Sequence, residues 1–229
     1  MKRFVILGAA AILASGSAGA QTLLQDTFAG ENGGASQLNF ASFTNWNVAG
    51  KVDMIGQGNP WGISCVGMCV DMDGTGGPGA LVSKQNFAFS SGDVMKISLN
   101  VSGSQRGNAL DDFYLHLNFG SNTTLGSFLG TGGFAGSGNI GNTAAYNTSN
   151  SLAGNAPFSI WSFQFEALQA GSVQYTIGTN SADNVGPVLD DVLIERAQTG
   201  TVVPEPATWA MIAFGLTGIG VAAKRRMRK

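Results

Sequence analysis

Strict alternation between apolar and polar side chains is the feature that most constrains the fold of this 229-residue chain. Successive side chains of a β-strand point to opposite faces, so an apolar residue at every second position predicts a half-buried strand. Four segments show this pattern, with apolar residues at Met95, Ile97, Leu99 and Val101, at Phe113, Leu115, Leu117 and Phe119, at Trp161, Phe163 and Phe165, and at Val173, Tyr175 and Ile177. Segments 23–28, 46–55, 80–83, 86–89 and 188–194 predict shorter strands.

Turn signals separate these segments and set the fold class. They include Asp73-Gly74, Gly76-Gly77-Pro78 and Ser91-Gly92-Asp93, and the chain has 34 glycines. Many short strands separated by such turn sequences predict an all-β fold, an antiparallel β-sandwich or jelly roll, over residues 21–200. No segment of this region has a helical period. Residues 120–157 are rich in Gly, Asn, Ser and Thr and predict a long excursion with room for one weak hairpin.

The N-terminus has the pattern of a secretory signal peptide. Lys2 and Arg3 precede an apolar run over residues 4–13, and Ala18-Gly19-Ala20 supplies the small residues of a cleavage site. The apolar run is too short to span a membrane. We therefore expect residues 1–20 to be removed and the mature chain to begin at Gln21, outside the inner membrane.

The C-terminus, residues 201–229, predicts a sorting segment. Pro204, Glu205 and Pro206 precede the apolar residues 207–223, and residues 224–229 contain five Lys or Arg. A membrane-spanning helix needs about 20 apolar residues, or about 17 at the short end. The apolar run therefore predicts a single transmembrane helix of minimal length, with the basic tail in the cytoplasm.

This arrangement of motif, span and tail resembles the PEP-CTERM sorting signal of Gram-negative bacteria. The resemblance implies recognition by an exosortase, a membrane-embedded cysteine transpeptidase, with Pro204, Glu205 and Pro206 as the processing motif. It also implies transient residence in the inner membrane, followed by the cell surface or extracellular matrix. An ordinary C-terminal membrane anchor is the alternative.

Charge and cysteine usage fit an extracellular protein. Between residues 21 and 203 five basic side chains stand against thirteen acidic ones, a net charge near −8. This balance argues against nucleic acid or anionic lipid as a partner. Cys65 and Cys69 are the only cysteines, and an oxidising compartment favours a local disulfide between them. A reduced pair is the alternative, and a zinc site usually needs four ligands.

A second resemblance concerns the central domain. Residues 69–75, 104–107, 111–112 and 186–194 follow in an order similar to the galactose-binding-type jelly rolls of many PEP-CTERM proteins. Such jelly rolls often tie the first loop to the last strand through a calcium ion, which would make Asp26, Glu31, Asp190 and Asp191 the candidate ligands here. No cofactor is otherwise implied. Simple solvation of these acids at loop ends is the alternative.

Residue patterns for catalysis are weak, and we predict no enzymatic activity and no catalytic residue. His116 is the only histidine, and no Gly-x-Ser-x-Gly elbow occurs. Neighbouring strand residues point to opposite faces, so neither Asp111-Asp112 nor Asp190-Asp191 is a facing carboxyl pair. We expect Arg106 to pair with Asp111 or Asp112 across the turn, and Asp71-Met72-Asp73-Gly74 to form an Asp-Gly turn rather than a calcium loop.

These observations predict an exported, non-enzymatic protein of the cell surface or of an exopolysaccharide matrix. The alternative is a carbohydrate-binding module, in which aromatic faces stack on sugar rings. Its candidate residues are Trp46, Trp61, Arg106, Tyr114 and Tyr146. Burial of the tryptophans in the sandwich core is the competing outcome.

Overall fold

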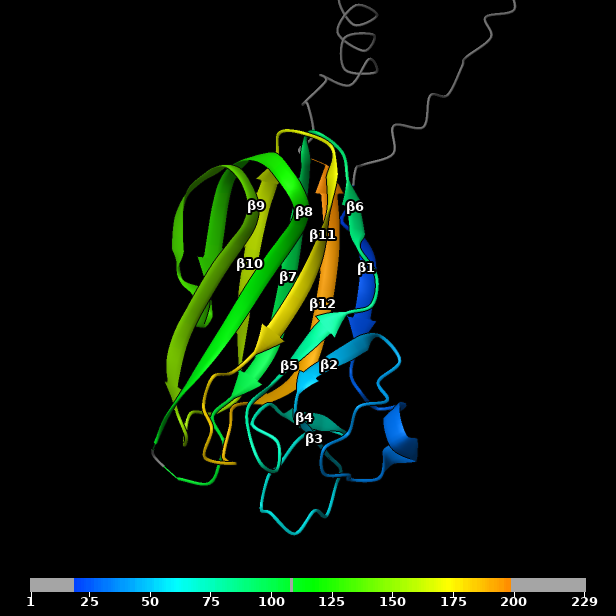
Figure 1. Cartoon of the computed structure of the whole chain (residues 1–229), viewed down its shortest axis with the longest axis vertical. Coiled ribbons are helices and arrows are strands. Elements are labelled where there is room, and N and C mark those ends of the chain that lie inside the picture. Colours follow the sequence, from blue (N-terminus) through cyan, green and yellow to red (C-terminus); the bar gives the residue numbers. More distant parts are fainter. Residues whose placement is uncertain (1–18, 108, 199–229) are drawn as a thin grey trace, which may run out of the picture. The chain divides into compact units, whose positions relative to one another are not determined.

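All the paired strands in the described part of the chain run antiparallel, as predicted for this all-β sequence (Figure 1). A computed structural model describes residues 19–107 and 109–198. The strands are β1 (Gln21–Asp26), β2 (Trp46–Gly50), β3 (Asp53–Ile55), β4 (Cys69–Asp71), β5 (Gly79–Ser83), β6 (Phe87–Phe89), β7 (Asp93–Ser102), β8 (Leu110–Thr131), β9 (Gly136–Ala153), β10 (Ser159–Ala167), β11 (Gly171–Gly178) and β12 (Val188–Gln198). Two short 3₁₀ turns, η1 (Glu31–Gly34) and η2 (Gly132–Phe134), complete the described elements.

The four alternating segments lie in β7, β8, β10 and β11, which confirms the period-2 prediction. In β7, for example, Met95, Ile97 and Leu99 are fully buried, whereas Lys96 and Ser98 between them are half-buried. One apolar face of each strand therefore supplies the core.

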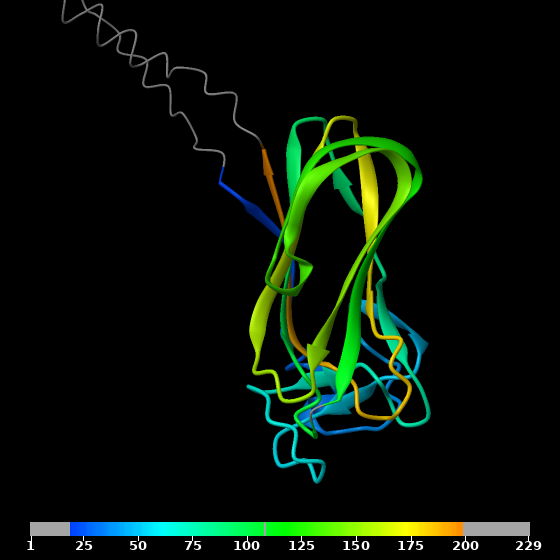
Figure 2. The same ribbon diagram turned by 90° about the vertical axis from the view of Figure 1, so that its left-hand side faces the viewer.

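The strands follow the order β2-β5-β11-β8-β10-β7-β12-β4-β3, with β1 paired to β12, β6 to β11 and β9 to β8. Strand β8 joins two layers, because residues 114–118 pair with β11 and residues 125–131 pair with β10. The sheet curls back on itself at this strand, as the side view in Figure 2 shows. Aromatic rings fill the interior: the ring centroids of Phe113 and Trp161 lie 5.6 Å apart, and those of Phe119 and Phe165 lie 5.5 Å apart.

Residues 120–153 belong to a hairpin of β8 and β9, so the hairpin expected in this segment is present, but it is a long extension of the sheet and not an excursion from it. Strands β8 and β9 pair from Leu110 opposite Ala153 to Gly130 opposite Gly136. The alternation of apolar and polar residues is weak in this segment because β9 buries few side chains. Of its 18 residues only Leu152 is buried. Backbone hydrogen bonds rather than a continuous apolar face therefore define this hairpin.

The segment expected as one strand over residues 46–55 is divided into β2 and β3. Gly50, at the end of β2, has a φ of 77°, and a Cβ there would overlap the carbonyl oxygen of Pro78. Glycine is the residue that tolerates such a turn. Strand β4, which the sequence pattern did not predict, then pairs with both β3 and β12.

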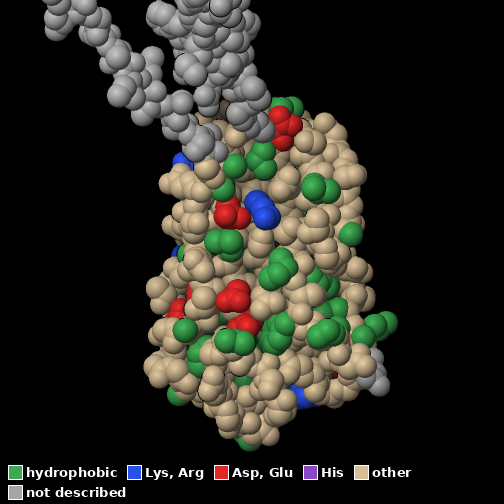
Figure 3. Space-filling model, turned by 180° about the vertical axis from the view of Figure 1, so that it is seen from behind, with side chains coloured by type: hydrophobic (Ala, Val, Ile, Leu, Met, Phe, Trp, Pro, Cys, Tyr) green, Lys and Arg blue, Asp and Glu red, His purple; other side chains and the backbone are tan. Residues whose placement is uncertain are grey.

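The predicted signal peptide up to Ala18, the apolar segment 207–223 and the basic tail lie outside the described residues. Within residues 19–107 and 109–198, no helix has the length and apolarity needed to cross a membrane. On the face seen in Figure 3, uncharged side chains and backbone make up most of the surface, with a few Asp, Glu, Lys and Arg side chains between them.

Candidate functional site

A pocket of about 210 Å³ lies beside β3 and β4, and we call it the Trp61 pocket. It is lined by Leu38, Asp53, Ile55, Trp61, Ile63, Asp71, Thr75, Arg106 and Asn184. These residues come from six separate segments of the chain. The pocket therefore exists only because β3, β4 and the loops after β7 and β11 meet at one end of the domain.

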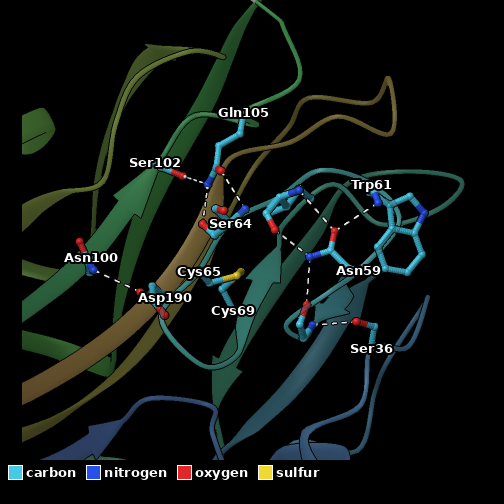
Figure 4. Close-up of a disulfide and its surroundings, with 12 residues drawn as sticks. Ser36, Asn59, Trp61, Ser64, Cys65, Cys69, Asn100, Ser102, Gln105 and Asp190 are labelled. Atoms are coloured by element: carbon cyan, nitrogen blue, oxygen red, sulfur yellow. Dashed lines mark hydrogen bonds between the residues drawn. A yellow bond between two sulfur atoms is a disulfide. The ribbon is translucent and has the colours of Figure 1, made fainter.

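The loop that carries Trp61 connects β3 to β4 over residues 56–68 and is held by its own polar side chains (Figure 4). The Asn59 side-chain amide donates to the carbonyl oxygens of Gly56 and Ile63 at 2.9 and 2.7 Å. Its oxygen accepts the backbone N–H groups of Trp61 and Ile63. One amide thus closes the turn and fixes the backbone of the aromatic residue.

Two further links tie this loop to the sheet. Cys65 is bonded to Cys69 at the start of β4, which confirms the predicted disulfide. Gln105, in the loop after β7, accepts the N–H of Ser64 at 2.9 Å and donates to the Ser64 carbonyl oxygen at 3.0 Å (Figure 4). These links hold Trp61 as a half-buried wall of the pocket.

Two carboxylates on the pocket wall already have protein partners. Asp53 accepts hydrogen bonds from the backbone N–H of Asn39 and from both the N–H and the hydroxyl of Thr75. Asp71 forms an ion pair with Arg106. The Asp71 side chain is only 2 % exposed, and this burial raises its pKa to about 7, an effect that the Arg106 charge only partly offsets.

Arg106 therefore pairs with Asp71, and the expected pairing with Asp111 or Asp112 was wrong. The guanidinium keeps one buried donor free: among the described residues its Nε has no hydrogen-bond partner. A buried donor without an acceptor is unfavourable by about 1–3 kcal/mol.

A second group of acids that interact with one another is Asp73, Asp111 and Asp183. Asp73 follows β4 and accepts the backbone N–H groups of Asp183 and Asn184 at 2.8 Å each, so it positions the loop that brings Asn184 to the pocket. Burial raises the pKa of Asp111 to about 6, with repulsion from Asp183 and Asp73 adding to the effect. Burial also raises the pKa of Asp73.

The structure brings only two of the five proposed carbohydrate-contacting residues, Trp61 and Arg106, into this pocket. Trp46 is fully buried and donates to Asp26 at 2.9 Å. Tyr146 on β9 packs against Phe128 of β8 and Phe163 of β10, and Tyr114 is half-buried on β8. His116 is half-buried on β8 opposite Thr176 and does not line the pocket.

The four candidate calcium ligands have other contacts. Asp26 accepts from Phe28, Asn45 and Trp46, and Glu31 accepts the N–H of Thr44. Asp190 and Asp191 both face the amide of Asn100 at 3.4 Å. Within the part of the chain that the structure describes, no three His, Cys, Asp or Glu side chains are arranged to hold a metal ion. The structure therefore does not gather these four acids into one site.

Sequence reasoning missed Leu38, Asp53, Thr75 and Asn184 as pocket residues. The sequence around Asn184 contains no pattern that predicts a pocket residue, because a long-range contact brings Asn184 to the pocket. Its side-chain oxygen accepts the N–H of Gly76. Asp71 was recognised as the start of a turn, and that turn does form, since Asp71 accepts the N–H of Asp73 at 3.2 Å. Its role in the pocket depends on Arg106, which lies 35 positions away.

Comparison with known families identifies the C-terminal segment. Residues 202–226 match the PEP-CTERM protein-sorting motif, which confirms the resemblance inferred from Pro204, Glu205 and Pro206. This motif indicates an exported protein that passes through a membrane and is sorted to the cell surface. The three motif residues themselves lie outside the described residues.

Three solved structures match this chain at low sequence identity. The first comprises the CBM22-1 and GH10 modules of xylanase 10B from Clostridium thermocellum complexed with xylohexaose, at 17 % identity and a TM-score of 0.41, covering 80 % of this chain and 29 % of that one. The second is the CBM22-1 xylan-binding domain of Xyn10C from Paenibacillus barcinonensis, at 13 % identity and a TM-score of 0.41, covering 81 % of this chain and 100 % of that one.

A third structure is the K3 cleaved adhesin domain of Lys-gingipain from Porphyromonas gingivalis, at 14 % identity and a TM-score of 0.39, covering 77 % of this chain and 99 % of that one. This chain spans less than a third of the length of the xylanase chain. At such TM-scores these similarities carry no conclusion about ligand or activity. No curated protein matches the chain.

Proposed function

We propose that this chain is an exported, non-enzymatic surface protein that is processed by an exosortase-type transpeptidase and that binds polysaccharide in the Trp61 pocket. The sorting part is supported by the motif at residues 202–226. The binding part is supported by one observation above the others: the aromatic ring of Trp61 and the guanidinium-bearing Arg106 line the same pocket.

The sorting proposal makes Pro204, Glu205 and Pro206 the recognition element. Proline fixes φ and disfavours helix in the preceding residue, so we expect an extended conformation before the apolar run. An extended acidic segment at the outer surface of the inner membrane is accessible to a membrane-embedded protease. The apolar residues 207–223 then serve as a temporary retainer, because their length leaves no margin for tilt.

The test of sorting is the mass of the intact protein from the surface fraction. We expect the unaltered chain to lose its C-terminal segment and the Glu205→Ala variant to stay in the inner membrane at full length. Thr201→Ala, a change outside the matched segment, is the control and should be processed normally. A surface form that still ends in Lys229 would refute processing.

The composition of the pocket favours a neutral sugar. An indole ring offers an apolar face for the C–H side of a sugar ring, while Arg106 and Asn184 offer hydrogen bonds to its hydroxyl groups. The volume, about 210 Å³, is below the roughly 300–1,000 Å³ of drug-sized sites, which suits one ring of a longer chain. The acidic domain and the pocket residues Asp53 and Asp71 disfavour a polyanion.

The carboxylates of the pocket support binding rather than hydrolysis. Glycoside hydrolysis requires one carboxyl group as an acid and a second as a base or nucleophile. Here Asp53 is fully engaged with Asn39 and Thr75, and Asp71 is engaged with Arg106. Both carboxylates therefore position the wall of the pocket.

A glycan array followed by calorimetry tests the binding proposal. We expect the exported chain to bind a neutral polysaccharide and Trp61→Ala to weaken binding about tenfold or more, the equivalent of about 1.4 kcal/mol. Phe158→Ala is the matched control, because Phe158 packs against the same small apolar cluster (Ile55, Ile63, Cys69 and Val188) without lining the Trp61 pocket. Equal binding by wild type and Trp61→Ala, or no binding to any glycan, would reject the proposal.

A further inference from the structure

Strand β9 is an unusually long edge. Within the described residues its 18 residues pair only with β8, so one side of its backbone has no strand partner. The other described strands with a single strand partner are β1, β2, β3 and β6, and each has six residues or fewer. A row of unpaired N–H and C=O groups of this length is a template for pairing with another chain.

The usual protection of such an edge is missing. Natural proteins blunt exposed edges with Lys or other charged side chains, with proline or with bulges. Strand β9 contains no Asp, Glu, Lys, Arg or Pro, and residues 117–165 as a whole contain no charged side chain and no histidine. The register irregularity of the hairpin lies at residues 118–123, mainly in β8.

Hydrogen bonds along the outer side of β9 are local substitutes for a partner strand. The N–H of Ala145 donates to the hydroxyl of Thr143 at 3.3 Å, and the N–H of Ser151 donates to the side-chain oxygen of Asn150 at 2.9 Å. Side-chain acceptors of this kind compete only weakly with a backbone ladder. A second strand could therefore displace them without leaving buried groups unpaired.

We propose that the β9 edge pairs antiparallel with the β9 edge of a second copy of this chain. The charge distribution of the chain favours a second copy as the partner of this edge. Two copies with a net charge near −8 repel each other, and the stretch without charged side chains, residues 117–165, which includes the whole of β9, is where they can approach. A basic partner would instead be drawn to exposed acidic side chains such as Asp183. Identical edges related by a two-fold axis form an isologous, closed dimer. This inference is independent of the proposed sugar site.

Sedimentation velocity on the exported chain, with its termini established by intact mass, tests the pairing. We expect a concentration-dependent dimer. Asn147→Lys combined with Ser149→Lys places like charges on exposed positions of the edge and should raise the dimer dissociation constant about tenfold or more. Far-UV circular dichroism and thermal unfolding check that the variant folds.

The control places the same charges on another edge. Asn47 and Ala49 are exposed on β2, so Asn47→Lys with Ala49→Lys adds an equal charge at the same spacing. This control should leave the dimer unchanged. A wild-type chain that stays monomeric at the highest soluble concentration would overturn the proposal. So would a dimer that the β9 variant leaves intact, or one that the β2 variant abolishes.

Discussion

At the scale of single residues, Asp26 and Trp46 stabilise each other rather than a ligand. The buried Asp26 carboxylate accepts from the indole N–H of Trp46, the amide of Asn45 and the backbone N–H of Phe28. We expect Trp46→Phe to lower the free energy of unfolding by about 1–3 kcal/mol, because the carboxylate loses a buried donor. Urea denaturation measures this loss. Unchanged glycan binding by the folded variant would separate it from the Trp61 pocket, whereas a stability equal to wild type would contradict the assigned contact.

The disulfide acts on the Trp61 loop more than on the whole domain. Cys65 and Cys69 enclose only a short loop, and the chain-entropy relation then gives about 2 kcal/mol of stabilisation. We expect Cys65→Ser with Cys69→Ser to lose about this amount in denaturation and to weaken glycan binding. Thiol labelling of the denatured wild-type chain under non-reducing conditions is the companion measurement. Two labelled cysteines per exported chain would contradict the pairing.

Sequence reasoning could identify the chemistry of the pocket residues but not their partners. Trp61 and Arg106 have the side chains that a sugar site needs, and both lie in the pocket. The Arg106 partner was expected at Asp111 or Asp112 because these acids are near in sequence. The actual partner, Asp71, is brought close by β12, which pairs with both β4 and β7. Such a contact depends on sheet order, which no local pattern encodes.

At the scale of elements, alternation predicted the strands that bury one face and missed those that do not. β7, β8, β10 and β11 have a continuous apolar face and were predicted. β9 and the three-residue β4 have no such pattern, although each is well paired. A strand whose outer face is solvated can be built from Gly, Asn, Ser and Thr, and its composition then resembles that of a loop.

The turn of the β8–β9 hairpin depends on a glycine that packs under Trp161. A Cβ at Gly133, in η2, would overlap the indole ring of Trp161. We expect Gly133→Ala to lower the free energy of unfolding by about 1–3 kcal/mol, the usual range for overpacking. Gly30→Ala is the matched control, because a Cβ there meets no atom within 4 Å. Equal thermal stability of the two variants would contradict this packing.

At the scale of the whole molecule, excess acid is concentrated where the fold buries it. Thirteen acidic side chains face five basic ones between residues 21 and 203. Asp71, Asp111 and Asp190 are each 2 % exposed or less. Burial raises their pKa values to about 7, about 6 and about 6, and Asp191 adds repulsion at Asp190. The folded chain therefore retains protons that the unfolded chain would release.

This proton balance determines how stability depends on pH. An unfolded Asp has a pKa near 3.9, so between about pH 4 and 7 the folded state binds more protons than the unfolded state. The free energy of unfolding must then fall as the pH rises through this window. We expect the unfolding temperature to be higher at pH 5 than at pH 8, as measured by calorimetry. A steady rise over that range would contradict the burial of these acids.

Asp111→Asn isolates one contribution to this dependence. Around Asp111 lie the acids Asp73 and Asp183, the hydroxyl of Ser181 and the Arg106 charge, and the Asp111 Oδ2 atom has no hydrogen-bond partner among the described residues. A neutral amide does not ionise, so the advantage of the variant over wild type in free energy of unfolding should be larger at pH 8 than at pH 5, by about 1–2 kcal/mol. Glu166→Gln, on β10 outside this acidic group, is the control and should keep the wild-type slope. A variant profile parallel to that of wild type would show that Asp111 ionises as freely in the folded chain as in the unfolded one.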